Sequence, residues 1–312
     1  MTSSGLYIHI PFCASACPYC DFAFVVGNRH LVDRYVDALI LEFNVRSVEL
    51  GPNPMFQTVY FGGGTPSAIP VDSVKRLANA LEREATVLQD AEITLEANPG
   101  DLQSFKGLAK IGINRLSLGV QAMSDRALKA LGRNHTSADA IAAFRAAREA
   151  GFRNVNIDLI FGAPGQTAHE WQSTLESAIH LGPEHFSIYG LTVEPGTAFW
   201  RRFQKGRLPL PSEDAQAEFY EHTLDRLSEA GYIQYEVSNF ARPGFASQYN
   251  LACWDRNDYL GIGLSAHSFL NGRRSWNTRD LPAYLGEVAS SGKAVAGCEV
   301  ISGADRHLES VM

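Results

Sequence analysis

The sequence lacks several features that would assign it to common functional classes. No stretch of its 312 residues approaches the 18 apolar residues that a membrane-spanning helix needs. Basic residues are too few for a general nucleic-acid binder, because 27 Lys and Arg face 34 Asp and Glu, a net charge of −7. Residues 1–5 contain neither the basic region nor the apolar core of a secretory signal. We therefore expect a cytoplasmic protein that binds no nucleic acid and has no transmembrane segment.

Cysteine is also scarce, but three of the five cysteines fall within eight positions. Cys13, Cys17 and Cys20 follow a Cys-x3-Cys-x2-Cys spacing, and Pro18 between them disfavours a regular helix, so we expect a loop. Iron–sulfur clusters are held by thiolates in short runs of this kind. Three thiolates on a four-iron cluster leave one iron open for chemistry, as catalytic metal sites do. The spacing therefore favours a [4Fe–4S] cluster with Cys13, Cys17 and Cys20 as its ligands.

Three alternatives for these cysteines stay open at this stage. Zinc usually takes Cys-x2-Cys pairs with a fourth Cys or His, and the nearby imidazoles are His9 and His30. Thiols without a metal are usually scattered through a core rather than grouped. A disulfide is disfavoured in a reducing compartment. Each alternative explains the grouped spacing less well than a cluster does.

Short apolar runs and amphipathic segments alternate along the first 190 residues. This strict alternation predicts a parallel sheet with right-handed crossovers. Six units are too few for a closed eightfold barrel, so we predict an α/β fold, a partial (β/α)6 TIM-like barrel over residues 1–191. Residues 192–312 are expected to form a small α+β extension that closes the barrel, with a strand at 232–237. The six barrel strands are predicted at Leu6–Ile10, Thr58–Phe61, Ile93–Ala97, Arg115–Val120, Asn154–Phe161 and Phe186–Leu191.

Polar residues and glycines recur where these strands end. A triple glycine, 62–64, follows the second strand, and Glu96, Gln121 and Asp158 lie at the ends of later strands. In barrels of this kind the carboxyl edge of the strands carries the active site. Strand-ending glycines need no function, but a Glu, a Gln and an Asp at one edge are not explained in that way. For Asp158, between apolar neighbours, an unpaired buried acid would be costly, which favours a functional partner.

Three segments together resemble the radical S-adenosylmethionine (SAM) proteins. They are Tyr7-Ile-His-Ile-Pro-Phe-Cys13, the cysteine spacing and Phe61-Gly-Gly-Gly-Thr-Pro-Ser67. The similar branch contains the HemW-type heme chaperones and the oxygen-independent coproporphyrinogen III oxidases, and the resemblance runs from about residue 6 to the end. It implies the same barrel, a [4Fe–4S] cluster and SAM, whose reductive cleavage gives a 5′-deoxyadenosyl radical.

The resemblance also implies which residues contact SAM. Glycines let the backbone approach a ligand closely, and in the family this motif contacts the methionine end of SAM. A tyrosine between the second and third cysteines lies by the adenine, and one at the base of the loop touches SAM. Four further SAM-contacting positions hold acids, an amide and an arginine. In this sequence these residues are Gly63, Gly64, Thr65, Tyr19, Tyr7, Glu96, Gln121, Arg133 and Asp158.

Two departures favour the heme chaperones over the oxidases. The oxidases carry a fourth cysteine two residues after the third, where this sequence has Phe22, and they carry an N-terminal extension that it lacks. The predicted function is therefore to bind heme and deliver it to heme-dependent proteins. The alternative is an oxygen-independent coproporphyrinogen III oxidase, which decarboxylates its substrate oxidatively to protoporphyrinogen IX. A third hypothesis is a protein with the cluster but no transfer role.

The heme-binding motif of the chaperones, His-Asn-x-x-Tyr-Trp, is altered here. The corresponding stretch keeps its Asn and Trp, but Tyr249 stands for the His and Cys253 for the Tyr. Tyrosinate and thiolate both ligate heme iron, so Tyr249 and Cys253 remain candidates, with His267 as another. Relatives continue for about one further small domain, so we expect a truncated C-terminal domain. The sequence leaves open whether SAM is cleaved in turnover, and whether the protein forms a homodimer or contacts a membrane peripherally.

Overall fold

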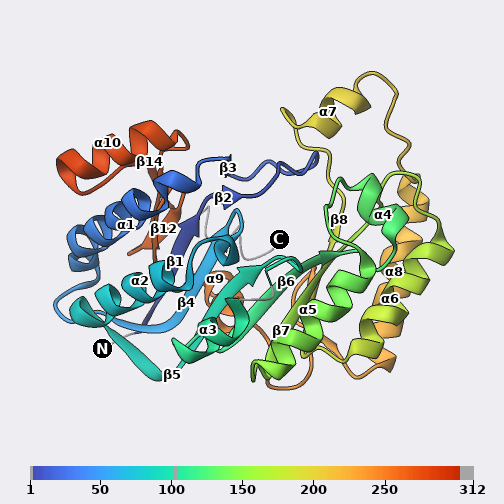
Figure 1. Cartoon of the computed structure of the whole chain (residues 1–312), viewed down its shortest axis with the longest axis horizontal. Helices are drawn as coiled ribbons and strands as arrows, with labels where there is room; N and C mark the ends of the chain where they lie inside the picture. The colour runs from blue at the N-terminus through green and yellow to red at the C-terminus, as the bar shows by residue number, and fades with distance from the viewer. Residues whose placement is uncertain (1–2, 102–103, 303–312) are drawn as a thin grey trace. The chain divides into compact units, whose positions relative to one another are not determined.

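The computed structural model describes residues 3–101 and 104–302 (Figure 1). By their internal contacts these residues form two compact units. The first contains the chain up to Cys13, then Ala23–Thr94 and the chain from Ser247 onward; the second contains Ala14–Phe22 and Leu95–Ala246. The cysteine loop thus contributes to both units, and strand β5 (Thr86–Ala97) crosses from the first to the second.

The first unit is a sheet in the order β14-β13-β12-β11-β1-β4-β5. Strand β1 (Ser4–Ile10) lies between β4 (Met55–Gly63) and β11 (Tyr259–Ile262) and is parallel to both. Because a central parallel strand is covered on both faces, it is mostly buried, and Leu6, Ile8 and Ile10 are fully buried. The other elements are β2 (Phe12–Cys13), β3 (Val25–Val26), α1 (Val32–Arg46), α2 (Val71–Glu84), α9 (Gln248–Trp254), β12 (His267–Leu270), β13 (Arg273–Asn277), α10 (Leu281–Ser291) and β14 (Val295–Val300).

The second unit continues the strand order with β6-β7-β8-β10-β9, in which β6, β7 and β8 are parallel. Helix α5 begins with a capping box, in which Thr136 and Asp139 each accept from the other's backbone N–H, and Thr167 and Glu170 do the same for α6. Its elements are α3 (Phe105–Lys110), β6 (Arg115–Gln121), α4 (Asp125–Ala130), α5 (Ser137–Glu149), β7 (Asn154–Phe161), α6 (Ala168–Leu181), β8 (His185–Gly190), α7 (Ala198–Phe203), α8 (Glu213–Glu229), β9 (Ile233–Gln234) and β10 (Asn239–Ala241).

The six predicted barrel strands are confirmed as β1, β4, β5, β6, β7 and β8, and β7 has the predicted bounds. The single strand predicted at 232–237 is wrong: only Ile233–Gln234 is a strand, and the chain turns before β10. Helices α4, α7 and α9 and strands β2, β3, β10, β13 and β14 were not predicted. In the described part of the chain no helix is long and apolar enough to cross a bilayer.

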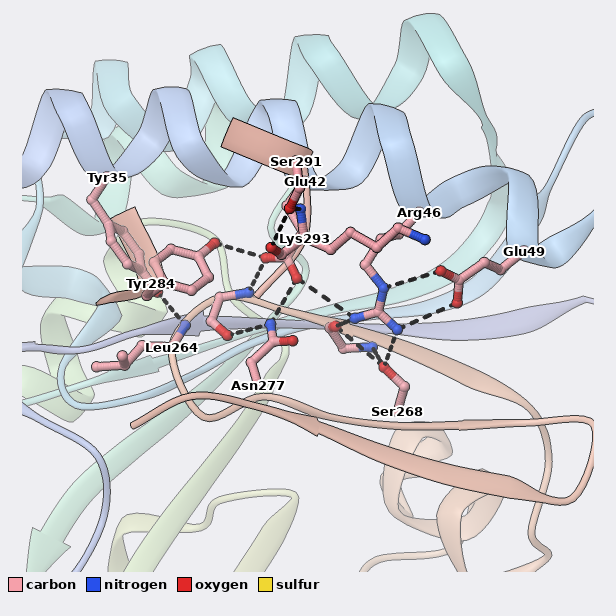
Figure 2. A network of polar contacts seen from close by, with 12 residues as sticks. Tyr35, Glu42, Arg46, Glu49, Leu264, Ser268, Asn277, Tyr284, Ser291 and Lys293 are labelled. Carbon is pink, nitrogen blue, oxygen red and sulfur yellow. Dashed lines mark hydrogen bonds and ion pairs between the residues drawn. The ribbon is translucent and has the colours of Figure 1, made fainter. Parts of the chain in front are cut away.

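A buried carboxylate joins helix α1 to helix α10, strand β13 and the residue that follows β11 (Figure 2). The Glu42 carboxylate accepts hydrogen bonds from Tyr284 Oη at 2.7 Å, Asn277 Nδ2 at 2.6 Å and the Gly263 N–H at 2.8 Å. Arg46, one turn along α1, lies 3.5 Å from the same carboxylate. A fully buried acid is tolerated here because every side of it meets a donor. Glu42 thereby joins α1, α10 and β13 at one point.

The buried hydroxyl of Tyr35 joins α1 to the end of β1. Tyr35 Oη donates to the His9 carbonyl oxygen at 2.8 Å and accepts from the Leu264 N–H at 2.8 Å. The His9 ring is itself buried: Nε2 donates to the Ala23 carbonyl oxygen at 2.7 Å, and Nδ1 lies 3.2 Å from Tyr7 Oη. His9 therefore links β1 to the segment that follows the cysteine loop.

The buried His9 ring should make stability depend on pH. Burial lowers the pKa of His9 from 6.5 to about 4. The unfolded chain binds this proton below pH 6.5 and the folded chain does not, so the free energy of unfolding falls between pH 6.5 and 4. We expect wild type to lose about 3 kcal/mol more than His9→Gln over this range, measured by urea denaturation. His169→Gln, at an exposed position, is the control and should follow wild type. Parallel curves for wild type and His9→Gln would contradict this assignment.

Candidate functional site

The first end of the cysteine loop is hydrogen-bonded to the glycine motif. The carbonyl oxygen of Ile10 accepts from the Gly64 N–H at 2.9 Å, and that of Phe12 accepts from the Thr65 N–H at 3.0 Å. Thr65 Oγ1 also lies 3.6 Å from Cys13 Sγ, as a donor. The glycine motif and the first cysteine, which are about fifty residues apart in the sequence, are thus held together in the first unit.

Two of the glycines are required by close approach. Gly63 has φ +115°, and a Cβ there would lie 2.6 Å from the His9 ring. A Cβ on Gly64 would lie 2.6 Å from the Pro11 carbonyl oxygen and 3.0 Å from Cys13 Sγ. No other residue fits at either position without moving the loop. The structure thus places Gly63, Gly64 and Thr65 next to the start of the cysteine loop.

The second end of the loop packs within the second unit. The Cys20 N–H donates to the Cys17 carbonyl oxygen at 3.2 Å, which closes a turn around Pro18. The Pro18 ring lies against Gly132, where a Cβ would come within 2.5 Å of it, and the Pro18 carbonyl oxygen accepts from the Phe199 N–H at 2.8 Å. The Tyr19 ring packs against Leu131, Ile160 and Ala163. Cys17 and Cys20 are therefore carried by a loop with fixed neighbours.

The thiols suit an iron–sulfur cluster by their chemistry. Cys13, Cys17 and Cys20 form no disulfide and are half-buried. The Sγ atoms of Cys13 and Cys17 each accept a hydrogen bond, as cluster thiolates do. His9, a zinc-ligand alternative, has both ring nitrogens engaged by Ala23 and Tyr7. Within the described residues, no three His, Cys, Asp or Glu side chains are grouped closely enough to hold a metal ion. The fit to a cluster is therefore argued from the thiols and their hydrogen-bond donors alone.

Arg133 presents an unused donor beside the cysteine loop. Its Nη1 donates to Cys17 Sγ at 3.3 Å, and its Nη2 donates to the Gly119 carbonyl oxygen at 3.0 Å and to Asn98 Oδ1. Its Nε is buried, and no acceptor reaches it among the residues that the structure describes. A buried orphan donor on a cation fits the carboxylate of an incoming ligand such as SAM.

Gln121 is held in a strained conformation at the end of β6. Its φ is +68°, a region that residues other than glycine seldom adopt, and the pairing of β6 with β7 shifts register between Leu118 and Gln121. Strain of this kind is retained where a side chain must point in one direction. Glu96 lies in the same unit near the end of β5 and is half-buried. Both predicted SAM contacts thus lie at strand ends.

Asp158 in β7 is a carboxyl group surrounded by donors. Asn156 Nδ2 donates to its Oδ1 at 2.7 Å, and Ser117 Oγ donates to both its oxygens at 3.2–3.3 Å. Burial raises the pKa of Asp158, and the amide and hydroxyl donors oppose that rise. Its oxygens can accept bonds from a ribose hydroxyl or an ammonium group.

A polar chain behind Asp158 was not predicted. Asn156 Oδ1 lies 2.6 Å from His185 Nδ1, and His185 Nε2 lies 2.7 Å from Tyr235 Oη. Burial lowers the pKa of His185 well below its ordinary value, so the ring is neutral, with Nδ1 as donor and Nε2 as acceptor. The spacing of Asn154, Asn156 and Asp158 at every second residue of β7 is the signal that could have indicated this polar face.

The three heme candidates lie in different environments of the first unit. The half-buried Tyr249 ring packs against Tyr7, Tyr60 and Tyr259, and desolvation raises the pKa of its hydroxyl well above the usual range. Burial also raises the pKa of the Cys253 thiol to about 11. His267 is exposed, its ring stacks on Trp276 at 5.9 Å, and desolvation lowers its pKa. At neutral pH His267 alone of the three offers a free lone pair without losing a proton.

The chain is similar to proteins of one family. A family model described as the radical SAM superfamily matches residues 7–178. The heme chaperone HemW of Bacillus subtilis is 39% identical over 289 residues, which are 92% of this chain and 76% of the relative. HemW of Lactococcus lactis is 41% identical over 284 residues, 90% of this chain and 74% of the relative. HemW of Escherichia coli is 39% identical over 288 residues, 88% of this chain and 74% of the relative.

A solved structure confirms the predicted fold. The radical SAM enzyme coproporphyrinogen III oxidase (HemN) from Escherichia coli matches with a TM-score of 0.86 and 28% sequence identity. The match covers 99% of this chain and 74% of that one. The predicted partial barrel with a large parallel sheet is therefore the architecture of this chain.

Replacing Gly64 should disrupt the cysteine loop. In Gly64→Ala the added Cβ meets Pro11 and Cys13, and overpacking of this kind costs about 1–3 kcal/mol. We expect less than roughly half of the wild-type iron and sulfide per chain after anaerobic reconstitution, with a lower melting temperature. Gly286→Ala, where a Cβ has no neighbour within 4 Å, should keep wild-type values. Full cluster content in Gly64→Ala would show that the contact with Cys13 is not needed.

Proposed function

The chain belongs to the radical SAM superfamily and, within it, to the HemW heme chaperones, and we propose that it binds heme and delivers it to heme-requiring proteins. The observation that carries the proposal is 39% identity to a named heme chaperone over 92% of this chain. Membership of the family implies a [4Fe–4S] cluster and SAM. The chain spans about three quarters of the length of these relatives, so their whole activity is assigned here as a proposal.

We assign cluster binding to Cys13, Cys17 and Cys20. The Thr65 hydroxyl and the Arg133 guanidinium donate to two of the three thiols and would stabilise them as thiolates. The cluster and SAM, when bound, supply the reductive cleavage of the sulfonium. The chain's own residues hold the ligand and keep the loop in place.

The SAM contacts are assigned in each unit separately. The backbone at Gly63 and Gly64, with Thr65, lies beside Cys13 and would hold the methionine end. Arg133 Nε would donate to the carboxylate. The remaining contacts are assigned to Glu96, Gln121, Asp158, Tyr7 and Tyr19, with Tyr19 packed against an apolar cluster that suits an adenine ring.

His267 is the axial ligand that we propose for heme. Its exposed imidazole is neutral and lies against the Trp276 ring, which offers a flat apolar surface next to a porphyrin. Tyr249 and Cys253 would each have to lose a proton from a desolvated group with a raised pKa before binding iron, which costs free energy. The altered motif therefore moves ligation away from α9 and onto β12.

The oxidase is the second candidate function, because HemN shares the fold over nearly the whole of this chain. The position of the oxidases' fourth cysteine holds Phe22, whose side chain is 66% exposed. An exposed apolar ring cannot serve as a thiol, which favours the chaperone. We further propose a cytoplasmic location, acceptor proteins as partners, and a division into a barrel (1–191) and an extension (192–312).

Heme titration should separate the ligand candidates. We expect purified wild type to shift the Soret band at micromolar heme, and His267→Ala to weaken heme binding by about tenfold or more, about 1.4 kcal/mol, because the axial bond is lost. Tyr249→Phe and Cys253→Ala should keep wild-type affinity, and His169→Ala is a control at an exposed histidine. No shifted Soret band in wild type would reject heme binding. Loss of binding in Cys253→Ala with His267→Ala unaffected would reject His267.

The oxidase alternative is tested by its product. With cluster, SAM and a reductant under anaerobic conditions, we expect no protoporphyrinogen IX from coproporphyrinogen III, because the position of the fourth cysteine holds Phe22. Product formation is followed by fluorescence after oxidation, with an authentic oxidase of this family as the positive control. Turnover by this chain would make it an oxidase and would overturn the proposed order of the two functions.

A further inference from the structure

The guanidinium of Arg133 reaches a cluster thiol as well as the proposed SAM carboxylate. Nη1 donates to Cys17 Sγ at 3.3 Å, while Nε remains free to meet an anion. We propose that Arg133 sets the reduction potential of the cluster by donating to its ligand Cys17. The inference rests on the proposed cofactor site and adds to Arg133 a function that is independent of SAM binding.

The position of Arg133 is fixed on several sides. Nη2 donates to the Gly119 carbonyl oxygen at 3.0 Å and to Asn98 Oδ1, and the Arg133 N–H donates to the Leu128 carbonyl oxygen at 2.9 Å. Its own side chain is half-buried. A long side chain held at this many points does not sample other directions freely, so the bond to Cys17 is a constant feature of the site.

The thiol partner is fixed as well. Pro18, the residue after Cys17, packs on Gly132, the residue before Arg133, and only a glycine allows this approach because a Cβ would lie 2.5 Å from Pro18 Cδ. Gly132 also has φ +71°, which favours glycine independently. Two adjacent contacts, Pro18 on Gly132 and Cys17 on Arg133, therefore hold the two segments in register.

The chemical consequence follows from how proteins tune iron–sulfur clusters. Hydrogen bonds to cluster sulfurs and nearby positive charge stabilise the reduced cluster, which carries one more negative charge. Arg133 supplies both, at a partly buried site where screening by water is weak. Removing it should make the cluster harder to reduce, even with no SAM present.

The test measures the potential of heme-free, SAM-free protein by EPR-monitored titration after anaerobic reconstitution. We expect Arg133→Gln to lower the equilibrium constant for one-electron reduction by about tenfold, about 59 mV. Arg133→Lys, which keeps the charge without the planar fork, should lie between Gln and wild type. Arg126→Gln is the matched control, because Arg126 lies in α4 and pairs with Glu170. Equal potentials in Arg133→Gln and Arg126→Gln would overturn the proposal.

A second measurement uses the wild type alone, so it does not depend on a variant that still assembles the cluster. Wild type labelled with ¹⁵N-arginine should show a ¹⁵N hyperfine coupling to the reduced cluster by pulsed EPR, and its absence would overturn the proposal. Failure of heme transfer, with the potential shift present, would reject the chaperone function and leave this inference standing. If reconstituted wild type holds no cluster, the proposed cofactor site fails and this inference fails with it.

Discussion

The site depends on how closely the glycine motif approaches the backbone of the cysteine loop. The carbonyl oxygens of Ile10 and Phe12 accept from the N–H groups of Gly64 and Thr65. The chain that leaves β1 is therefore hydrogen-bonded to the chain that leaves β4. The fit leaves no volume for a Cβ at Gly64. A loop held by backbone bonds keeps its path whatever its side chains bind, which a metal-binding loop needs before its metal arrives.

Buried polar contacts in the core of the first unit fix the position of β1, which leads into the cysteine loop. Helix α1 holds the end of β1 through Tyr35, and the Glu42 carboxylate joins the same helix to the Asn277 amide and the Tyr284 hydroxyl. The groups around Glu42 form one hydrogen-bond network. Losing one donor leaves the buried Glu42 carboxylate short of a hydrogen bond in an apolar core. The position of β1, and with it the start of the cysteine loop, is therefore determined by side chains far along the chain, which local sequence does not reveal.

The sequence predicts those elements whose own residues determine them. Strand β7 alternates polar and apolar residues up to Asp158, ends in three apolar residues and is bounded by turns. Helix α5 begins at a capping box, so both elements could be located. Strand β5 begins at Thr86, earlier than predicted, because its first five residues are exposed or half-buried and lack a buried apolar pattern. The segment 232–237 looked like one strand, but Tyr235 Oη bonds to His185 and the chain turns there. Tertiary hydrogen bonds, rather than the local sequence, determine the conformation of this segment.

The same division holds for the site. Cysteine spacing and the triple glycine are visible because their chemistry tolerates few other residues, whereas Asn156 and His185 act only through the residues that they contact. The stretch that corresponds to the heme motif has tertiary contacts that its sequence pattern does not predict. The N–H of Tyr249 and the Ser247 hydroxyl both donate to the buried Glu92 carboxylate, which draws the start of α9 inward. In our proposal the heme ligand lies outside this motif, at His267 on β12, whose exposure only the fold reveals.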